Sequence, residues 1–368
     1  MSEKLWQKVA KIIVRASGNP LFQANDTMIK LFKTLLNEEQ AQFLLNFRNP
    51  PLTFEKLKEK TGMEERELKA MLNSVMDEGI IFDMPNEESN VMEYHLMAPI
   101  PDIFEYSLVK EGTTERRKKL AKLYDEIFEN ARELTQENYE QMMPIFKNKM
   151  PAFTRILPTD KELIIPQEET LPFFEAAKII DRYDNISLSR CPCKFEKELL
   201  GDPCKATTDP FRCLHFGHVG RYFIEHGFGK PISKEEAKKV LLDAEKDGLV
   251  HKTFHYDFDL DKEENAICNC CKCCCIIFQS YYRGIWPFHT KTAYIAQVDE
   301  KKCNGCGVCV EKCPIEAITL IDAKSQIDTN KCIGCGVCVH QCPENARTLR
   351  KTELRSVFIP VPRADLSN

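Results

Sequence analysis

Residues 303–314 read CNGCGVCVEKCP, and residues 332–343 read CIGCGVCVHQCP. The two stretches align without a gap at a period of 29 residues, which is the distance from Cys303 to Cys332. Each stretch carries four cysteines separated by two, two and three residues, and each ends in a proline. Eight thiols at fixed, repeated spacing predict a metal-binding module in the C-terminal part of the chain.

This spacing is typical of paired [4Fe–4S] clusters, because in such runs the fourth cysteine binds the other cluster. The sequence therefore predicts two crossed ligand sets. Cluster I takes Cys303, Cys306, Cys309 and Cys342, and cluster II takes Cys332, Cys335, Cys338 and Cys313. Zinc ribbons also use two-residue cysteine spacing, but a complete duplicated run with both prolines favours the clusters.

The residues between these cysteines suit tight turns around a buried group. The glycines leave backbone N–H groups free to point at sulfur, and they are Gly305, Gly307, Gly334 and Gly336. We expect a small apolar shell from Val310, Val339, Ile315 and Ile318. The module resembles two-cluster bacterial-type ferredoxins, and this resemblance implies a ferredoxin-like domain that moves single electrons.

Ten of the 18 cysteines lie outside this module, all of them upstream of it. The first four are spread along the chain, and they are Cys191, Cys193, Cys204 and Cys213. The other six are crowded into CNCCKCCC, and they are Cys268, Cys270, Cys271, Cys273, Cys274 and Cys275. Crowded thiolates repel one another and oxidise readily, so these ten residues predict a further metal centre in the middle of the chain.

Three kinds of centre fit the ten cysteines. An additional iron–sulfur cluster is favoured because all-thiolate sites suit such clusters. A structural zinc site, with His215 or His218 as a further ligand, and a store of redox-active thiols remain open. We expect the two histidines to lie at a helix start or a turn instead. If the run 268–275 is helical, its cysteines occupy two opposite faces, so the run is either irregular or serves two centres.

The pattern of helices and strands predicts an α+β multidomain fold. Helical segments followed by a hairpin resemble a winged-helix domain over residues 1–112, and a helical linker follows over 113–155. A cysteine-rich α+β middle domain spans 156–290, and the ferredoxin-like domain with its two [4Fe–4S] clusters spans 291–350. Residues 351–368 form a C-terminal tail without clear structure.

The layout as a whole resembles a group of multidomain iron–sulfur proteins found in anaerobes. The segments that carry this resemblance are CPCK, CLHFG, ISKEEA, GLVH and CNCCKCCC. It implies a redox protein without naming a reaction. Exposed clusters and free thiolates are sensitive to oxygen, which also favours an anaerobic host.

Composition and charge limit the kinds of partner that we expect for this chain. The chain has a formal net charge of -5, and no run reaches the roughly 18 apolar residues that span a bilayer. The N-terminus has no apolar core of a signal peptide, so we expect a cytoplasmic protein without a membrane span. The predicted recognition helix, residues 64–78, carries a net charge of -3, which disfavours DNA as a partner. We expect the winged-helix-like domain to mediate a homodimer or a complex instead.

These observations predict an electron-transfer protein that exchanges single electrons with a redox partner protein. It is expected to be a component of an oxidoreductase system and not a stand-alone enzyme. One alternative is an oxidoreductase subunit with catalysis at the middle centre, and another is a redox-sensing regulator that uses the winged helix. No G-x-G-x-x-G, P-loop or nucleophile-elbow pattern points to a nucleotide or hydrolytic site.

Overall fold

The computed structural model describes residues 3–48, 50–110, 112–150, 152, 154–158, 172–255 and 263–364. The chain divides into two compact units. The first consists of Met1–Leu134, Phe195–Pro203 and Ile224–Gly229, and the second of Thr135–Lys194, Cys204–Phe223 and Lys230–Asn368. Within the described ranges, no helix combines the length and the apolar character that crossing a membrane requires.

The first unit is mainly helical, with one small antiparallel sheet. Its helices are α1 (Glu3–Ser17), α2 (Asp26–Leu35), α3 (Glu38–Leu44), α4 (Phe54–Thr61), α5 (Glu65–Met76), α6 (Phe104–Val109) and most of α7 (Glu115–Glu137). The segment Pro99–Ile103 before α6 is an irregular turn, because the backbone of residues 100–102 is not helical. Its strands β1 (Leu52–Thr53), β2 (Ile81–Pro85) and β3 (Met92–Leu96) pair in the order β1-β3-β2. Three helices and a hairpin are present as expected, whereas the winged-helix class itself stays a prediction.

Local signals in the sequence explain where these helices begin and end. The Thr53 hydroxyl accepts a hydrogen bond from the Lys56 N–H and so caps the start of α4. Gly62 ends α4 in the left-handed conformation at a φ of 65°. The exposed side of α5 carries both signs of charge, because Glu65 and Glu67 are accompanied by Arg66 and by Lys69, which pairs with Glu65 at 2.6 Å.

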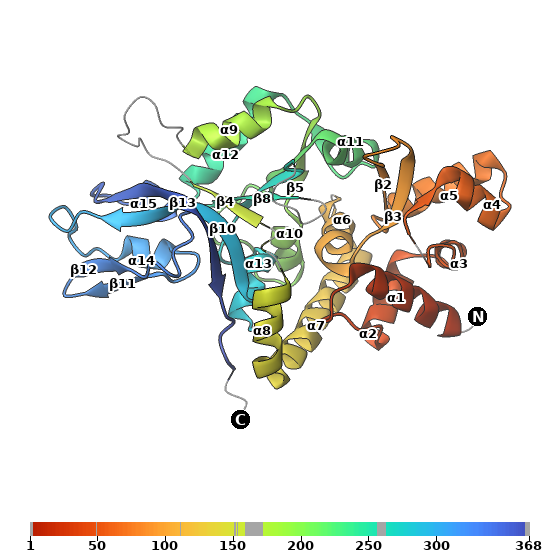
Figure 1. Cartoon of the computed structure of the whole chain (residues 1–368), viewed down its shortest axis with the longest axis horizontal. Coiled ribbons are helices and arrows are strands. Elements are labelled where there is room, and N and C mark those ends of the chain that lie inside the picture. Colours follow the sequence, from red (N-terminus) through yellow and green to blue (C-terminus); the bar gives the residue numbers. More distant parts are fainter. Residues whose placement is uncertain are drawn as a thin grey trace. The chain divides into compact units, whose positions relative to one another are not determined.

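The second unit is built on an eight-stranded mixed sheet in the order β13-β10-β4-β8-β9-β6-β5-β7 (Figure 1). Its strands are β4 (Thr154–Leu157), β5 (Ile186–Arg190), β6 (Phe211–Phe216), β7 (Lys230–Pro231), β8 (Val250–Phe254), β9 (Ala266–Cys270), β10 (Phe288–Val298) and β13 (Arg347–Ile359). A separate hairpin joins β11 (Ile318–Ile321) to β12 (Lys324–Ile327). Its helices are α8 (Tyr139–Lys149), α9 (Pro172–Asp181), α10 (Pro192–Leu199), which crosses between the units, α11 (Gly217–Glu225), α12 (Lys234–Lys246), α13 (Ile276–Tyr282), α14 (Val308–Lys312) and α15 (Val337–His340).

Helices α9 and α12 cover one face of this sheet (Figure 1). Their apolar residues pack on Leu214 of β6 and Ile267 of β9 in a common core. Because side chains alternate along a strand, the neighbours of these residues point to the opposite face. Cys268 and Cys270 therefore lie on the face that turns away from α9 and α12.

Three predicted boundaries differ from the structure. The boundary between residues 290 and 291 falls inside β10, so the middle and ferredoxin-like segments share one sheet and one compact unit. The helical linker over 113–155 is α7 and α8, and the first unit ends inside α7. The expectation of an unstructured tail over 351–368 is wrong as far as Ile359, because this stretch continues β13 and pairs with β10. Residues 365–368 lie outside the described residues.

Candidate metal centres

A cavity, called cavity I here, lies in the duplicated module. Its four cysteines are Cys303, Cys306, Cys309 and Cys342, so three come from the first repeat and one from the second. Cys306 is exposed, whereas Cys309 and Cys342 are buried. Gly305 adopts a φ of 75°, and a Cβ atom there would lie 2.2 Å from the Ala323 carbonyl oxygen. Only glycine fits this turn of the cavity wall.

A second cavity, cavity II, is its counterpart in the other half of the module. Its four cysteines are Cys332, Cys335, Cys338 and Cys313, so here too one cysteine crosses from the other repeat. All four are buried. The apolar wall comes from Ala296, Ile315, Ile318 and Ile333.

Backbone N–H groups point at the two crossing cysteines from equivalent positions of the repeat. The Ala317 N–H donates to Cys313 Sγ at 3.3 Å, and the Ala346 N–H donates to Cys342 Sγ at 3.4 Å. Such donors stabilise negative charge on sulfur, which is what thiolate ligands of a metal cluster require.

Arg347 supplies a buried positive charge to cavity I, which it helps to line. Its side chain is 4% exposed, and its Nη2 donates to Cys309 Sγ at 3.1 Å. Its Nη1 is also buried and has no hydrogen-bond partner among the described residues. An orphaned donor in the wall of a four-cysteine cavity fits an anionic occupant with acceptor atoms, such as the sulfides of an iron–sulfur cluster.

Six of the middle cysteines form a closed ring of hydrogen-bonded thiols, the six-thiol group. Cys191 contacts Cys193 and Cys213, Cys268 contacts Cys213 and Cys270, and Cys275 contacts Cys193 and Cys270. The register of the sheet explains much of this convergence, since Cys213 of β6 lies opposite Cys268 of β9. Cys191 directly follows β5, and Cys275 precedes α13.

The pKa values of the six thiols are alternately lowered and raised around this ring. Hydrogen bonds from Cys193 and Cys213 hold the pKa of Cys191 well below its usual value. Hydrogen bonds from Cys213 and Cys270 lower the pKa of Cys268 to about 5. The pKa values of the thiols between them are raised for the same reason. The thiols with a lowered pKa offer thiolates, the form in which cysteine binds metals.

A buried lysine faces the same ring. Lys252 is fully buried on β8, and its Nζ donates to Cys275 Sγ at 3.4 Å and lies 4.5 Å from the centre of the Phe278 ring. Burial alone lowers the pKa of Lys252, but the thiolates of Cys270 and Cys275 outweigh this effect, so the pKa is raised. A charged ammonium in this position requires negative charge beside it, which the six-thiol group provides.

The other four middle cysteines converge separately, as the four-thiol group. Cys204, Cys271, Cys273 and Cys274 bring their Sγ atoms within 4.8 Å of one another. The Sγ atoms of Cys204 and Cys271 are 3.7 Å apart, and those of Cys204 and Cys273 are 3.8 Å apart. Cys271 and Cys274 are buried, and they pack on Ala244 and Leu249 in a small cluster of their own.

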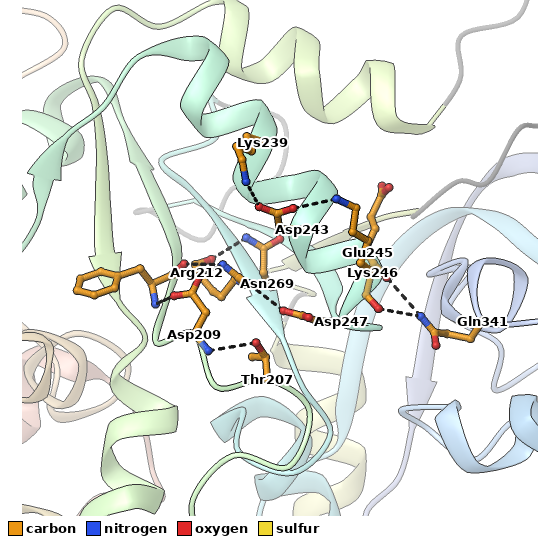
Figure 2. Close-up of polar contacts among 11 residues, drawn as sticks. Thr207, Asp209, Arg212, Lys239, Asp243, Glu245, Lys246, Asp247, Asn269 and Gln341 are labelled. Atoms are coloured by element: carbon orange, nitrogen blue, oxygen red, sulfur yellow. Dashed lines mark hydrogen bonds and ion pairs between the residues drawn. The ribbon is translucent and has the colours of Figure 1, made fainter.

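A polar network holds the elements behind these groups together (Figure 2). Arg212, on β6 next to Cys213, forms ion pairs with Asp209 and with Asp247 at the end of α12. Asn269, between Cys268 and Cys270 on β9, donates to the Arg212 carbonyl oxygen at 2.6 Å. Gln341, next to Cys342, donates to the Lys246 carbonyl oxygen at 3.2 Å. Figure 2 shows how these contacts link the cysteine-bearing strands, α12 and the duplicated module.

Residues 295–343 match the family model described as a 4Fe-4S dicluster domain. This stretch is a 4Fe-4S dicluster domain, and the chain is an iron–sulfur protein. Protein Pixie of Drosophila melanogaster is 56% identical to this chain over 36 residues, which are 10% of this chain and 6% of Protein Pixie. The chain therefore spans only a small part of this relative, and no solved structure matches the chain.

Sequence reasoning named all ten middle cysteines but not their division into two groups. The run 268–275 is not helical, because residues 266–270 form β9 and a turn follows before α13 begins at Ile276. It is therefore irregular, which is one of the two outcomes expected from its crowding. His215 hydrogen-bonds Ser189 at 2.9 Å and stacks on Phe223, and it is not part of the four-thiol group. The three buried cations near the cysteines, Arg347, Lys252 and Lys194, were not identified. A basic residue within an apolar, β-branched strand, such as Lys252 in VHKTF, was the signal available for one of them.

Proposed function

We propose that this chain is an electron-transfer protein that passes single electrons between a redox partner protein and two [4Fe–4S] clusters. Cavity I holds cluster I and cavity II holds cluster II, each through its four cysteines. When bound, each cluster accepts or releases one electron at a time. The observation that carries the proposal is the pair of four-cysteine cavities, each completed by a cysteine from the other repeat, within a dicluster domain.

The exposure of the cysteines indicates where a partner exchanges electrons with the domain. Cys306 of cavity I is exposed, whereas all four cysteines of cavity II are buried. Electron transfer is fastest over short distances, so a partner protein gains most by docking at the rim of cavity I near Cys306. Electrons from the partner then reach cavity I first and cavity II second.

We propose the six-thiol group as a further iron–sulfur centre at the inner end of this path. Cys270 and Cys275 of the ring belong to the same apolar core as the four cysteines of cavity II. Lys252 places a positive charge beside the ring, which favours an anionic centre there. Cys191, Cys213, Cys270 and Cys275 are buried, so the ring suits an electron relay better than an open site for a substrate.

The first unit serves, in this proposal, as a docking or dimerisation platform and not as a DNA-binding module. Phosphate contacts need lysine and arginine, whereas residues 64–78 carry a net charge of -3 and the exposed Lys69 is paired with Glu65. Arg116, in the one basic run of this region, is engaged with Glu78 at 2.6 Å and with the Leu35 carbonyl oxygen.

The test uses the full chain purified without oxygen. We expect about eight irons from the dicluster domain alone, more if the six-thiol group is loaded, and signals of reduced [4Fe–4S] clusters in electron paramagnetic resonance (EPR) spectra. Stopped-flow mixing with a reduced low-potential donor and then with an oxidant should reduce and reoxidise the clusters without loss of iron. A Cys335→Ser variant should lose the signal of cluster II, and a Cys306→Ser variant that of cluster I.

Two results would contradict the proposal. One is a protein that binds zinc but no iron in the dicluster domain. The other is a loaded protein whose clusters cannot be reduced and reoxidised reversibly.

A further inference from the structure

The four-thiol group has the dimensions of a coordination shell around a single ion. Cys273 lies 3.7 Å from Cys274 and 3.8 Å from Cys204, and Cys204 lies 3.7 Å from Cys271, all measured between Sγ atoms. In a tetrahedron with zinc–sulfur bonds of about 2.3 Å, the edges between sulfur atoms are about 3.8 Å long. These three distances match edges of this tetrahedron, and all four Sγ atoms lie within 4.8 Å of one another.

We propose that the four-thiol group binds one zinc ion in tetrahedral coordination, as a structural site separate from the iron–sulfur centres. A cubane cluster does not fit here, because each of its cysteines binds a different iron and the sulfur atoms are held apart by the width of the cluster. All four Sγ atoms instead lie within 4.8 Å of one another. Four thiolates also leave no open position, which is the arrangement of structural zinc sites.

Two contacts outside the thiols support a charged metal–thiolate complex. The Lys205 N–H donates to Cys273 Sγ at 3.4 Å, as backbone donors do around metal-bound thiolates. The Lys194 side chain is 5% exposed, and its Nζ has no hydrogen-bond partner among the described residues. The thiols that act on it electrostatically are first Cys191 of the six-thiol group and then Cys271 and Cys204 of the four-thiol group, so Lys194 serves both groups. One zinc ion with four thiolates carries a net charge of about -2, so a buried ammonium beside it is stabilised.

The surroundings point to a structural role and not to a place in the electron path. Cys271 and Cys274 pack in a small cluster with Ala244 and Leu249, apart from the core that contains cavity II. Zinc has no accessible redox change, so it cannot relay electrons. Its effect is to cross-link the loop that carries Cys204 to the turn after β9.

This cross-link acts directly on the six-thiol group. Three of the zinc ligands lie in the turn 271–274, and the residues on either side of that turn are Cys270 and Cys275. Both flanking cysteines belong to the six-thiol ring. A zinc ion that fixes the turn therefore fixes the spacing of two ligands of the neighbouring centre.

The test measures zinc and iron separately on the full chain, produced with both metals in the medium and purified without oxygen. We expect about one zinc per chain by mass spectrometry, and X-ray absorption at the zinc edge should show four sulfur neighbours at about 2.3 Å. Cys204→Ser and Cys273→Ser alter the two half-buried ligands and should reduce the zinc content at least fivefold. Cys193→Ser changes a ligand of the six-thiol group and should leave the zinc content unchanged.

Several results overturn the proposal. They are an iron ion in place of zinc, nitrogen or oxygen neighbours at the zinc edge, and zinc retained by Cys204→Ser. X-ray absorption at the zinc edge of the unaltered protein tests the proposed site even if the variants do not fold. The EPR signals of the dicluster domain report on the proposed function independently, so the two proposals can fail separately.

Discussion

Replacing Arg347 by methionine should lower the reduction potential of the cluster proposed for cavity I. Reduction adds one negative charge to the cluster, and the guanidinium group of Arg347 lies 3.1 Å from Cys309 Sγ. The side chain is 4% exposed, so water screens this charge only weakly. Methionine fills a similar volume without a charge or a donor, and the oxidised state is then favoured.

The size of the effect follows from the distance. The added charge is spread over the whole cluster, so we take a separation of roughly 6 Å and an effective dielectric constant of about 20, which gives about 3 kcal/mol. For a one-electron couple this energy corresponds to a shift of about 120 mV. The lost hydrogen bond to Cys309 acts in the same direction, so a decrease of about 100 mV is a reasonable expectation.

The assay is a redox titration followed by EPR on the full chain. Arg350→Met is the matched control, because Arg350 lies on the same strand but is exposed, and its potential shift should stay below about 20 mV. Arg347→Lys keeps the charge and should recover part of the shift. The reasoning is refuted if Arg347→Met retains all its iron and shifts the potential by less than about 20 mV, or if the control shifts it equally.

Three further predictions concern separate parts of the chain. Gly334→Ala would place a Cβ atom 2.3 Å from the Tyr294 carbonyl oxygen, so the protein should lose the cluster proposed for cavity II and about four irons. The control is Gly307→Ala, which is also at positive φ but would make only ordinary contacts, and it should keep these irons. Lys252→Met removes the cation beside the six-thiol group, so iron beyond the dicluster domain should be lost while the domain's EPR signals persist. Burial, opposed by a hydrogen bond from the backbone of Ala98, raises the pKa of Asp102 from 3.8 to about 7. The folded state therefore holds a proton that the unfolded state releases, and the free energy of unfolding should fall by up to about 1.4 kcal/mol per pH unit between pH 4 and 7. In Asp102→Asn this slope, measured by urea titration, should disappear.

The sequence predicted best those features that depend on short stretches of chain. The capping box of Ser233 and Glu236 starts α12 as its residue pattern indicates. Thr53 and Gly62 bound α4 for equally local reasons. The duplicated cysteine run places the two dicluster cavities because its ligands, turns and prolines all lie within about forty residues.

Features that depend on distant pairing could not be predicted in the same way. The residues after Arg350 read as a tail because their alternation of polar and apolar residues is weak. They become strand β13 only because β10 offers an edge, with Ile359 opposite Phe288 and Arg347 opposite Val298. Strand β10 begins at Phe288, before the expected boundary at 290/291, so a division by composition cuts through one sheet.

The ten middle cysteines show the same limit at the level of chemistry. On β9 the two-residue period puts Cys268 and Cys270 on the same face of the sheet. Cys268 is the cross-strand partner of Cys213 on β6, and this pairing brings the three cysteines together in the six-thiol group. The turn that follows carries Cys271, Cys273 and Cys274 to Cys204, which is 67 residues upstream of Cys271. Adjacent cysteines thus enter different sites because the backbone changes from strand to turn between them, and spacing alone does not encode that change. The proposed division also explains why the cysteines are crowded. A zinc ion in the four-thiol group does not change its charge, and by holding the turn 271–274 it keeps Cys270 and Cys275 at fixed positions. These two cysteines then serve the proposed redox centre in the six-thiol group.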